Sequence, residues 1–302
     1  MNNIIEIKDL TKKFNQKKAV DNLSLNIKQG EIFGLIGPDG AGKTTTLRIL
    51  SGIMLPSSGR ISVLGFSLPD DAEAVKEHIG YMCQKFNLYI DLTVNENINF
   101  FADLFLISRT VLEKRIQPLM EMTRLGPFRK RLAGDLSGGM KQKLALICTL
   151  IHRPKVLFLD EPTTGVDPVS RRDFWRILHN ILLEGVTILV STPYMDEAEW
   201  CNRIGLVFNG RMLSIATPHN LKKDLKSIVV EVPADVKITK GMVRDVPGLM
   251  DYQLLGEKHH IILRDEAGLN RLKNMAAHKD RIRIVPPTVE DVFINTIKES
   301  RK

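Results

Sequence analysis

Nine consecutive residues near the start of the sequence carry the spacing of a phosphate-binding loop. They fit the pattern G-x-x-x-x-G-K-[ST] and are Gly37, Pro38, Asp39, Gly40, Ala41, Gly42, Lys43, Thr44 and Thr45. Glycines let successive backbone N–H groups converge on an oxyanion, and a following helix would add partial positive charge. Lys43 can reach the β- and γ-phosphates of a nucleotide, and the Thr44 hydroxyl can hold Mg²⁺. We expect a nucleoside triphosphate site here, in preference to a glycine-rich turn beside a surface lysine.

Two adjacent carboxylates, Asp160 and Glu161, follow the apolar residues 156–159. A buried strand that ends in this way places both at the edge where α/β sheets bind ligands. Asp160 suits Mg²⁺ and its waters, and Glu161 could activate a water that attacks a γ-phosphate. An acidic pair at a strand end can also be a helix cap. Because a phosphate loop precedes it and Pro-Thr-Thr-Gly-Val-Asp-Pro follows it at 162–168, we favour the catalytic interpretation.

Ser137, Gly138 and Gly139 precede a helical pattern of apolar residues and form a second possible anion cradle. From these three residues alone, a plain helix N-cap explains the pattern equally well. The choice depends on what the rest of the chain contains.

Periodicity predicts the elements that must position these residues. Residues 31–36 read as a strand before the loop and residues 45–50 as the start of a helix after it. Further strands are predicted, several by alternating apolar and polar side chains; they cover residues 3–8, 21–28, 60–65, 79–84 and 203–208. A capping box from Thr93 to Glu96 opens a long helical pattern, and we expect an all-helical insertion over about 86–150.

The character of the sequence changes at about residue 221. Strands are expected at 228–232, 260–263 and 281–285, with a helix at about 266–277 and a last helix capped by Thr288 and Asp291. We interpret residues 221–302 as a small α+β appendage. His259 and His260 are adjacent, so on a strand they face opposite sides, and a metal site there is not expected.

Composition sets the outer limits. The 302 residues are 43% hydrophobic and 26% charged, with a formal net charge of +8, which suits an anionic ligand or membrane surface. No basic run is long enough to indicate nucleic acid. The three cysteines have no metal-like spacing, as expected for reduced thiols in a cytosol. Neither a signal peptide nor an apolar stretch of 18 residues is visible, so we expect no bilayer span.

Taken in order, these motifs resemble those of the ATP-binding subunits of ABC transporters, over residues 3 to about 220. Residues 37–45 match the Walker A loop, Gln84 the Q-loop, 136–142 the signature, 156–161 the Walker B strand and 165–167 the D-loop. The resemblance implies an α/β fold of the P-loop NTPase type, with an ATPase domain at 1–220. It also implies ATP and Mg²⁺ as ligands, with Thr44, Gln84 and Asp160 near the metal. Phe14, which could equally be a core residue, falls at the family's adenine-stacking position, and Asp167 falls in the D-loop.

The resemblance also implies partners. Two ATPase subunits, identical or different, would pair head to tail, so that each ATP lies between one chain's Walker A loop and the other chain's Ser137–Gly139. Hydrolysis would drive a separate membrane permease, with this chain cytoplasmic and peripheral on the inner face of the membrane. The C-terminal tail is similar to that of drug-export relatives, which favours export. A soluble ABC ATPase acting on ribosomes or DNA stays a second hypothesis, although such chains usually carry two cassettes.

Two positions depart from the family pattern. Asp39 replaces the commoner Asn in the loop, as in drug-export relatives, and Pro193 stands where the switch segment has His. Proline has neither an imidazole nor an N–H, so it can neither contact the γ-phosphate nor help to hold the attacking water. Our hypothesis is a slow site that pairs with a competent ATPase subunit. The alternative is that Glu161 and Gln84 suffice for catalysis, with Lys43 on the phosphates, and that Pro193 is tolerated.

The residues between Gln84 and Thr93 could form the docking groove for a cytoplasmic helix of the permease. Phe86, Leu88 and Tyr89 are the apolar candidates. The same side chains could instead belong to the core of the helical insertion, and the sequence does not separate the two interpretations.

Overall fold

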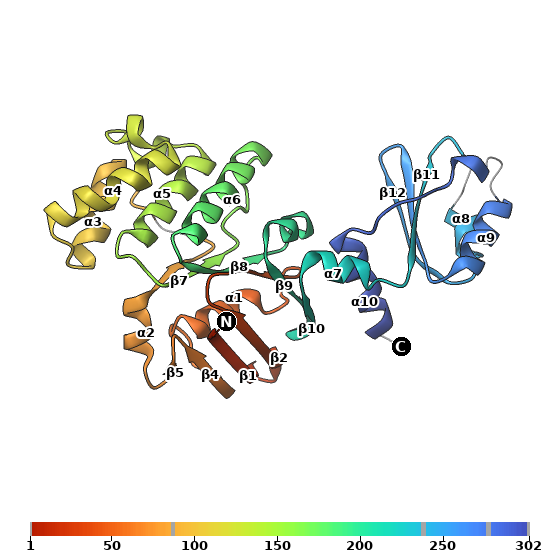
Figure 1. The fold of residues 1–302 in the computed structure, drawn as a ribbon, viewed down its shortest axis with the longest axis horizontal. Coiled ribbons are helices and arrows are strands. Elements are labelled where there is room, and N and C mark those ends of the chain that lie inside the picture. Colours follow the sequence, from red (N-terminus) through yellow and green to blue (C-terminus); the bar gives the residue numbers. More distant parts are fainter. Residues whose placement is uncertain (1, 86–87, 237–239, 276–278, 301–302) are drawn as a thin grey trace. The chain divides into compact units, whose positions relative to one another are not determined.

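The chain was analysed as a computed structural model, which describes residues 2–85, 88–236, 240–275 and 279–300. The chain folds into two compact units, Met1–Ile215 and Ala216–Lys302 (Figure 1). Each is described by itself. None of the described helices combines the length and the apolar composition that crossing a bilayer requires.

A six-stranded sheet forms the centre of the first unit. Its strands, in spatial order, are β10 (Arg211–Ala216), β9 (Arg203–Phe208), β3 (Ile32–Ile36), β8 (Thr187–Thr192), β7 (Val156–Asp160) and β6 (Ile79–Met82). The pairs from β9 to β6 are all parallel, and every residue of β3, β7 and β8 is buried. Continuous apolar runs are typical of strands covered on both faces. Their carboxyl ends meet at one edge, where the predicted site residues follow β3, β6 and β7. The α/β fold class is confirmed.

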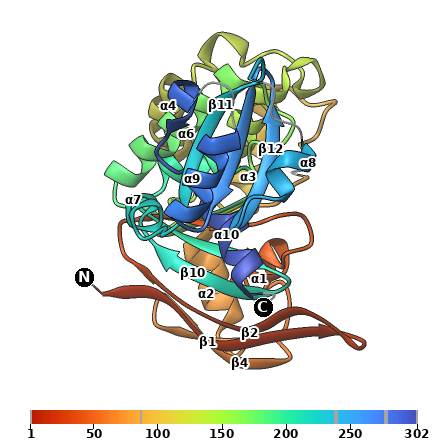
Figure 2. The same ribbon diagram turned by 90° about the vertical axis from the view of Figure 1, so that its right-hand side faces the viewer.

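An antiparallel sheet lies on the other side of α1 (Lys43–Leu50), and Figure 2 shows its long strands as a curved layer. In spatial order its strands are β2 (Lys17–Lys28), β1 (Asn3–Phe14), β4 (Ser58–Val63) and β5 (Phe66–Leu68). Helix α2 (Ala72–His78) follows β5. One hydrophobic core joins both sheets through α1. The first two strands are longer than predicted, because register shifts and a positive φ at Asp9 interrupt the alternation without ending the pairing.

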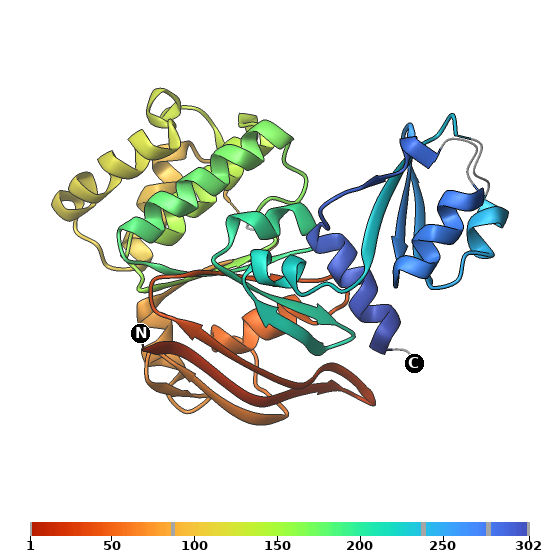
Figure 3. The ribbon, with the colours of Figure 1, turned by 45° about the vertical axis from the view of Figure 1, so that its right-hand side comes forward.

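The residues between β6 and β7 form a helical part with its own hydrophobic core (Figure 3). Its elements are α3 (Val94–Leu104), α4 (Arg109–Thr123), the 3₁₀ turns η1 (Gly126–Phe128) and η2 (Ala133–Asp135), and α5 (Gly138–Leu150). The capping box from Thr93 to Glu96 is formed in both directions, as the sequence predicts. After β7 come α6 (Pro168–Leu183) and, beyond β8, the 3₁₀ helix η3 (Met195–Trp200).

The second unit is an antiparallel sheet with helices. Its elements are α7 (Pro218–Lys223), β11 (Ile228–Pro233), α8 (Lys240–Arg244), β12 (Leu249–Leu255), β13 (Lys258–Leu263), α9 (Glu266–Met275), η4 (Lys279–Arg281), β14 (Arg283–Ile284) and α10 (Val289–Ser300). The strand order is β12-β13-β11-β14. Thr288 and Asp291 cap α10, as predicted. The His259 side chain contacts Tyr252, whereas that of His260 contacts Asp291.

Candidate functional site

The phosphate loop connects β3 to α1, and its shape requires glycine at particular positions. Gly40 and Gly42 have φ of +75° and +101°, in the left-handed region that favours glycine. A Cβ at Gly42 would lie 2.4 Å from the Ala19 carbonyl oxygen, and one at Gly37 would lie 2.1 Å from that of Val207. The loop is therefore held against β2 and β9 so closely that no side chain fits at these two positions.

Lys43 is the first residue of α1, and its side chain is only 3% exposed. Its ammonium group donates hydrogen bonds to the carbonyl oxygens of Gly37, at 2.7 Å, and Pro38, at 3.1 Å. It also lies 3.1 Å from Glu161 Oε1, whose side chain is 7% exposed. The structure thus brings the predicted phosphate-binding cation and the predicted general base into one buried ion pair.

Thr44 and Asp160 meet at the edge of the sheet. The Thr44 hydroxyl donates to Asp160 Oδ1 at 3.0 Å, and the Ser191 hydroxyl donates to the same oxygen at 2.7 Å. Hydroxyl and carboxylate oxygens are hard donors, and Mg²⁺ in nucleotide sites typically takes one or two of them together with phosphate and water oxygens. These residues therefore fit a magnesium ion.

Glu161 is fixed in place by its neighbours. Gln84 Nε2 donates to Glu161 Oε2 at 2.9 Å, and the Thr164 hydroxyl approaches the same oxygen at 3.4 Å. The Glu161 backbone has a φ of +50°, and its N–H is directed at Ser191, with the hydroxyl and carbonyl oxygens each at 3.1 Å. Because Gln84 contacts Glu161 through its amide nitrogen, a role for it at the metal stays a prediction.

Tyr81 of strand β6 and Cys83, which directly follows the strand, are two further ionisable groups near Asp160. Burial raises the pKa of the Tyr81 phenol to about 12, and the negative charge of Asp160 adds to the shift. Burial likewise raises the pKa of the Cys83 thiol. Both groups therefore stay neutral near pH 7.

A cavity of about 450 Å³ opens over the loop. Its lining residues are Phe14, Lys17, Lys18, Ala19, Gly40, Ala41, Gly42, Lys43, Thr44, Thr45, Glu161 and Asn209. We call it the nucleotide cavity, because its volume is in the range of small-molecule sites and it combines a phosphate loop with an aromatic ring. Phe14 is 47% exposed, so it is not a core residue, and the Lys12 ammonium nitrogen lies 5.1 Å from the centre of its ring.

The serine–glycine corner lies outside the lining of this cavity. Ser137 caps α5 by accepting a hydrogen bond from the Met140 N–H at 3.4 Å, and Ser137 and Gly138 are exposed. Gly139 is buried against α6, where a Cβ would lie 2.6 Å from that of Ser170. Asp167 caps α6, and the hydrogen bonds from Ser170 hold its pKa below the usual range. Within one chain, the Ser137–Gly138 part of this corner therefore faces solvent.

The segment after β8 carries Pro193 in place of the expected histidine. Thr192 and Thr163 donate to the two carboxylate oxygens of Glu197 at 2.5 and 2.6 Å, and the Arg171 guanidinium lies 4.2 Å from the centre of the Tyr194 ring. The carbonyl of Thr192 accepts the Gly37 N–H at 3.3 Å, which joins the segment to the phosphate loop. Among the described residues that line the nucleotide cavity, none is histidine.

The apolar residues between Gln84 and Thr93 differ in their burial. Phe86 lies outside the described residues. Leu88 packs against the core of the helical part, which is the structural alternative that the sequence leaves open. Tyr89 and Ile90 are 47% and 59% exposed, and the Tyr89 backbone is held by both polar atoms of the Asn97 side chain.

Sequence reasoning missed Ser191 as a site residue. It pairs with Asp160 across β7 and β8, at a register that no local pattern reveals. The Ser191 hydroxyl donates a hydrogen bond to Asp160 and accepts one from the Glu161 N–H, so it links the two carboxylate residues.

Comparisons with known proteins agree with this geometry. A family profile described as "ABC transporter" matches residues 20–164. The probable multidrug ABC transporter ATP-binding protein YbhF of Escherichia coli (strain K12) is 45% identical over 219 residues, which are 72% of this chain and 38% of that protein. The Nod factor export ATP-binding protein I of Burkholderia pseudomallei (strain 1710b) is 36% identical over 301 residues, covering 96% of this chain and 95% of that protein.

The chain spans less than two thirds of the length of some of these relatives. It covers 38% of YbhF and 64% of the Nod factor export ATP-binding protein I of Neorhizobium galegae, to which it is 42% identical. Among solved structures, an ATP-binding subunit of an ABC transporter aligns with a TM-score of 0.65 and 28% identity, over 73% of this chain and 92% of that one. A dimeric ATP-binding cassette in a post-hydrolysis state, bound to ADP and Pi, aligns with a TM-score of 0.64 and 26% identity, over 70% of this chain and 98% of that one.

Proposed function

The chain belongs to the family of ABC transporter ATP-binding proteins, and from that premise we propose that it binds and hydrolyses MgATP to energise export through a separate membrane permease. The printed names of its relatives concern multidrug and Nod factor export, which supports export over import. The observation that carries the proposal is that Lys43, Thr44 and Glu161 line the nucleotide cavity, with Lys43 paired to Glu161 and Thr44 bonded to Asp160.

The residues of this chain divide the work at that cavity. Lys43 must exchange the Gly37 and Pro38 carbonyls and Glu161 for phosphate oxygens, and that exchange frees the Glu161 carboxylate. Glu161, held by Gln84, can then accept a proton from the attacking water. Thr44 and Asp160 would hold Mg²⁺, which neutralises charge on the phosphates. Phe14 offers its ring to the adenine.

We propose a site shared by two chains paired head to tail. The exposed Ser137 corner has a capped helix start and no contact with the nucleotide cavity of its own chain, so its natural ligand is a nucleotide held by another chain. A dimeric solved relative is in keeping with such pairing. The arrangement predicts that neither half-site hydrolyses ATP alone.

Mixing two inactive variants tests this arrangement. Lys43→Ala removes the phosphate contact of one half-site and Ser137→Arg blocks the other, so each pure variant should be inactive. A mixed pair contains one intact site, made from Lys43 of one chain and Ser137 of the other, and should recover a substantial part of the ATPase rate. If mixtures remain as inactive as the pure variants, the shared site is wrong, whereas activity in pure Ser137→Arg would show a self-sufficient chain.

The permease is the proposed membrane partner, with this chain peripheral on the cytoplasmic face. We assign the exposed Tyr89–Ile90 segment as its docking surface, since it lies a few residues along the chain from Gln84, which donates a hydrogen bond to Glu161. Tyr89→Ala should leave ATP binding intact but uncouple transport in membrane vesicles. Leu183→Ala, which alters an 85% exposed apolar residue on α6, is the matched control and should leave transport unchanged.

Pro193 favours a second candidate, a regulatory half-site that hydrolyses slowly and pairs with a competent ATPase subunit. The nucleotide cavity retains the phosphate loop and general base, so nucleotide binding is preserved while one polar contact to the γ-phosphate is missing. Isolation of the assembled complex in detergent, followed by mass spectrometry of its ATPase subunits, separates identical from different pairs. The same preparation decides against an ATPase acting on ribosomes or DNA if a permease is present.

A further inference from the structure

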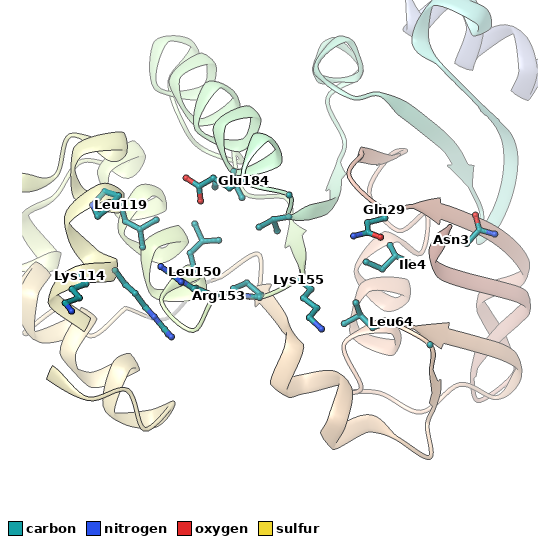
Figure 4. A pocket seen from close by; sticks show the side chains of 17 residues that line it. Asn3, Ile4, Gln29, Leu64, Lys114, Leu119, Leu150, Arg153, Lys155 and Glu184 are labelled. Atoms are coloured by element: carbon teal, nitrogen blue, oxygen red, sulfur yellow. The ribbon is translucent and has the colours of Figure 1, made fainter. Parts of the chain in front are cut away.

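A second cavity lies at the opposite end of strand β7 from the nucleotide cavity (Figure 4). Its volume is about 960 Å³, roughly twice that of the nucleotide cavity, and no described residue lines both. Lys155, immediately before β7, lines the second cavity, whereas β7 ends at Asp160 in the site described above. We call it the amino-end cavity. The proposed ATPase mechanism makes no use of it.

The amino-end cavity combines apolar walls with basic side chains. The apolar lining includes Leu119 from α4, the buried Leu150 and Ile181 at the ends of α5 and α6, and Val186. Figure 4 shows Leu119 and Leu150 beside Arg153, and Lys155 extending toward Leu64. This combination is typical of sites for ligands that have an apolar body and a polar end.

Charge in the cavity is strongly one-sided. Lys114, Arg115, Arg153 and Lys155 line it, and among the described residues Glu184 is the single acidic group in the lining. Arg115 donates to the Ile151 carbonyl at 2.9 Å, but within the described part of the chain neither Lys114, Arg153 nor Lys155 forms a side-chain hydrogen bond or an ion pair. An excess of basic over acidic groups in one cavity raises the local concentration of anions.

We propose that the amino-end cavity binds a small amphiphilic anion, with a phosphate or carboxylate head at Arg153 and Lys155 and a short apolar chain against Leu119, Leu150 and Val186. The head needs the basic rim, and the chain needs the apolar wall. A ligand with only one of these parts contacts either the basic rim or the apolar wall, and it therefore binds more weakly.

A ligand in this cavity would touch elements whose other ends carry predicted site residues. Helix α5 runs from the Ser137 corner to Leu150, α6 runs from Asp167 to Leu183 beside Glu184, and β7 runs from Lys155 to Asp160. A ligand in the amino-end cavity therefore contacts the far ends of three elements whose other ends carry site residues. A change in ATP turnover on ligand binding follows from this connection and rests on the proposed function, whereas the binding itself does not.

Calorimetric titration of the full chain with octyl phosphate tests the proposal. Saturating MgADP keeps the phosphate loop filled, and its own binding isotherm reports on the proposed function separately. Octyl phosphate should bind at least tenfold more tightly than inorganic phosphate, which has no chain, or octyl glucoside, which has no charge. Equal affinity for octyl phosphate and either of these two compounds would overturn the proposal.

Paired variants locate the binding. Arg153→Gln with Lys155→Gln should weaken octyl phosphate binding at least tenfold, while Lys8→Gln with Arg60→Gln, exposed residues of β1 and β4 outside both cavities, should leave it unchanged. Glu184→Gln removes an acidic charge from the lining and should tighten binding about two- to fivefold. Unchanged affinity in both cavity variants means that the anion binds elsewhere and the assignment is wrong.

Discussion

The Lys43 ammonium nitrogen lies 3.1 Å from Glu161 Oε1, and both side chains are buried at the base of the nucleotide cavity. A buried ion pair balances charge desolvation against mutual attraction, so removal of one partner costs more than removal of both. In the chain without nucleotide, the free energy of unfolding should therefore depend on whether one or both partners of the pair are removed. The pair also means that nucleotide binding must open a contact that is already made.

Lys43→Ala should lower the free energy of unfolding by about 3–5 kcal/mol, because it leaves the Glu161 carboxylate buried without its cation. The double variant with Glu161→Gln should recover part of that loss. Urea denaturation without nucleotide measures both. Lys76→Ala, which removes a surface pair with Glu73, is the control and should cost less than about 1 kcal/mol. Losses that simply add in the double variant would show that the two side chains do not interact.

Glu161→Gln should reduce ATP turnover by about 10²–10⁴-fold, since it removes the proton acceptor from the attacking water. ATP affinity should be maintained, because Lys43 then has one competitor fewer for the phosphates. Turnover in the assembled complex and equilibrium binding of ATP check the two parts separately. An active Glu161→Gln chain would move the general base to another residue.

Phe14→Ala should weaken ATP binding by about 1–3 kcal/mol, the usual range for stacking of a base on an aromatic ring. Phe14→Trp should retain affinity, because it preserves a flat face. Inorganic triphosphate has no base, so its binding should be the same in all three chains. An equal loss for triphosphate would indicate that Phe14 shapes the loop and does not stack on adenine.

Pro193→His should raise ATP turnover in the assembled complex by roughly 10²–10³-fold if a single positioned polar contact is what the site lacks. Pro193→Ala removes the proline without supplying an imidazole, and its rate should stay at the wild-type level. Steady-state phosphate release measures both. An unchanged rate in the histidine variant would mean that Glu161 and Gln84 already suffice.

His152 should make the first unit less stable in mild acid. Burial lowers the pKa of His152 below its ordinary value of about 6.5, against the opposing effect of its hydrogen bond to the Ile79 carbonyl. The folded chain therefore binds fewer protons than the unfolded chain, and stability falls as the pH drops from about 6.5 toward the lower folded value.

His152→Gln isolates this contribution. Its free energy of unfolding should depend less steeply on pH than that of the wild type between pH 7.5 and 5.5. Urea denaturation at several pH values in this range provides the measurement. Parallel curves for the two chains would show that His152 does not titrate on unfolding.

The sequence predicts the local parts of the site well. Each of three features is encoded within a few consecutive residues, so a local pattern is enough to place it. They are the phosphate loop, the strand that ends in Asp160 before Glu161, and the capping box at Thr93. The ion pair between Lys43 and Glu161 joins residues more than a hundred positions apart, and the sequence predicts a shared site for them but not this direct contact. The Ser191 contacts depend on strand register, which local sequence does not specify.

The second unit shows where periodicity fails. Strand β12 (Leu249–Leu255) was missed because it is a half-exposed edge strand with no clean alternation. The strand expected at 281–285 is reduced to Arg283–Ile284. The helix expected at 266–277 runs over Glu266–Met275 within the described residues, and an amphipathic pattern identifies it correctly. Edge positions carry the weakest pattern because neighbours constrain only one side of them.

Gly139 fits against Ser170 with no room for a methyl group, so the start of α5 and the capped start of α6 cannot shift independently. A neighbouring molecule that contacts Ser137 therefore finds Asp167 at a fixed position relative to Ser137. Association at this corner should then be all-or-none, and substitutions on either helix start should impair it by the same route.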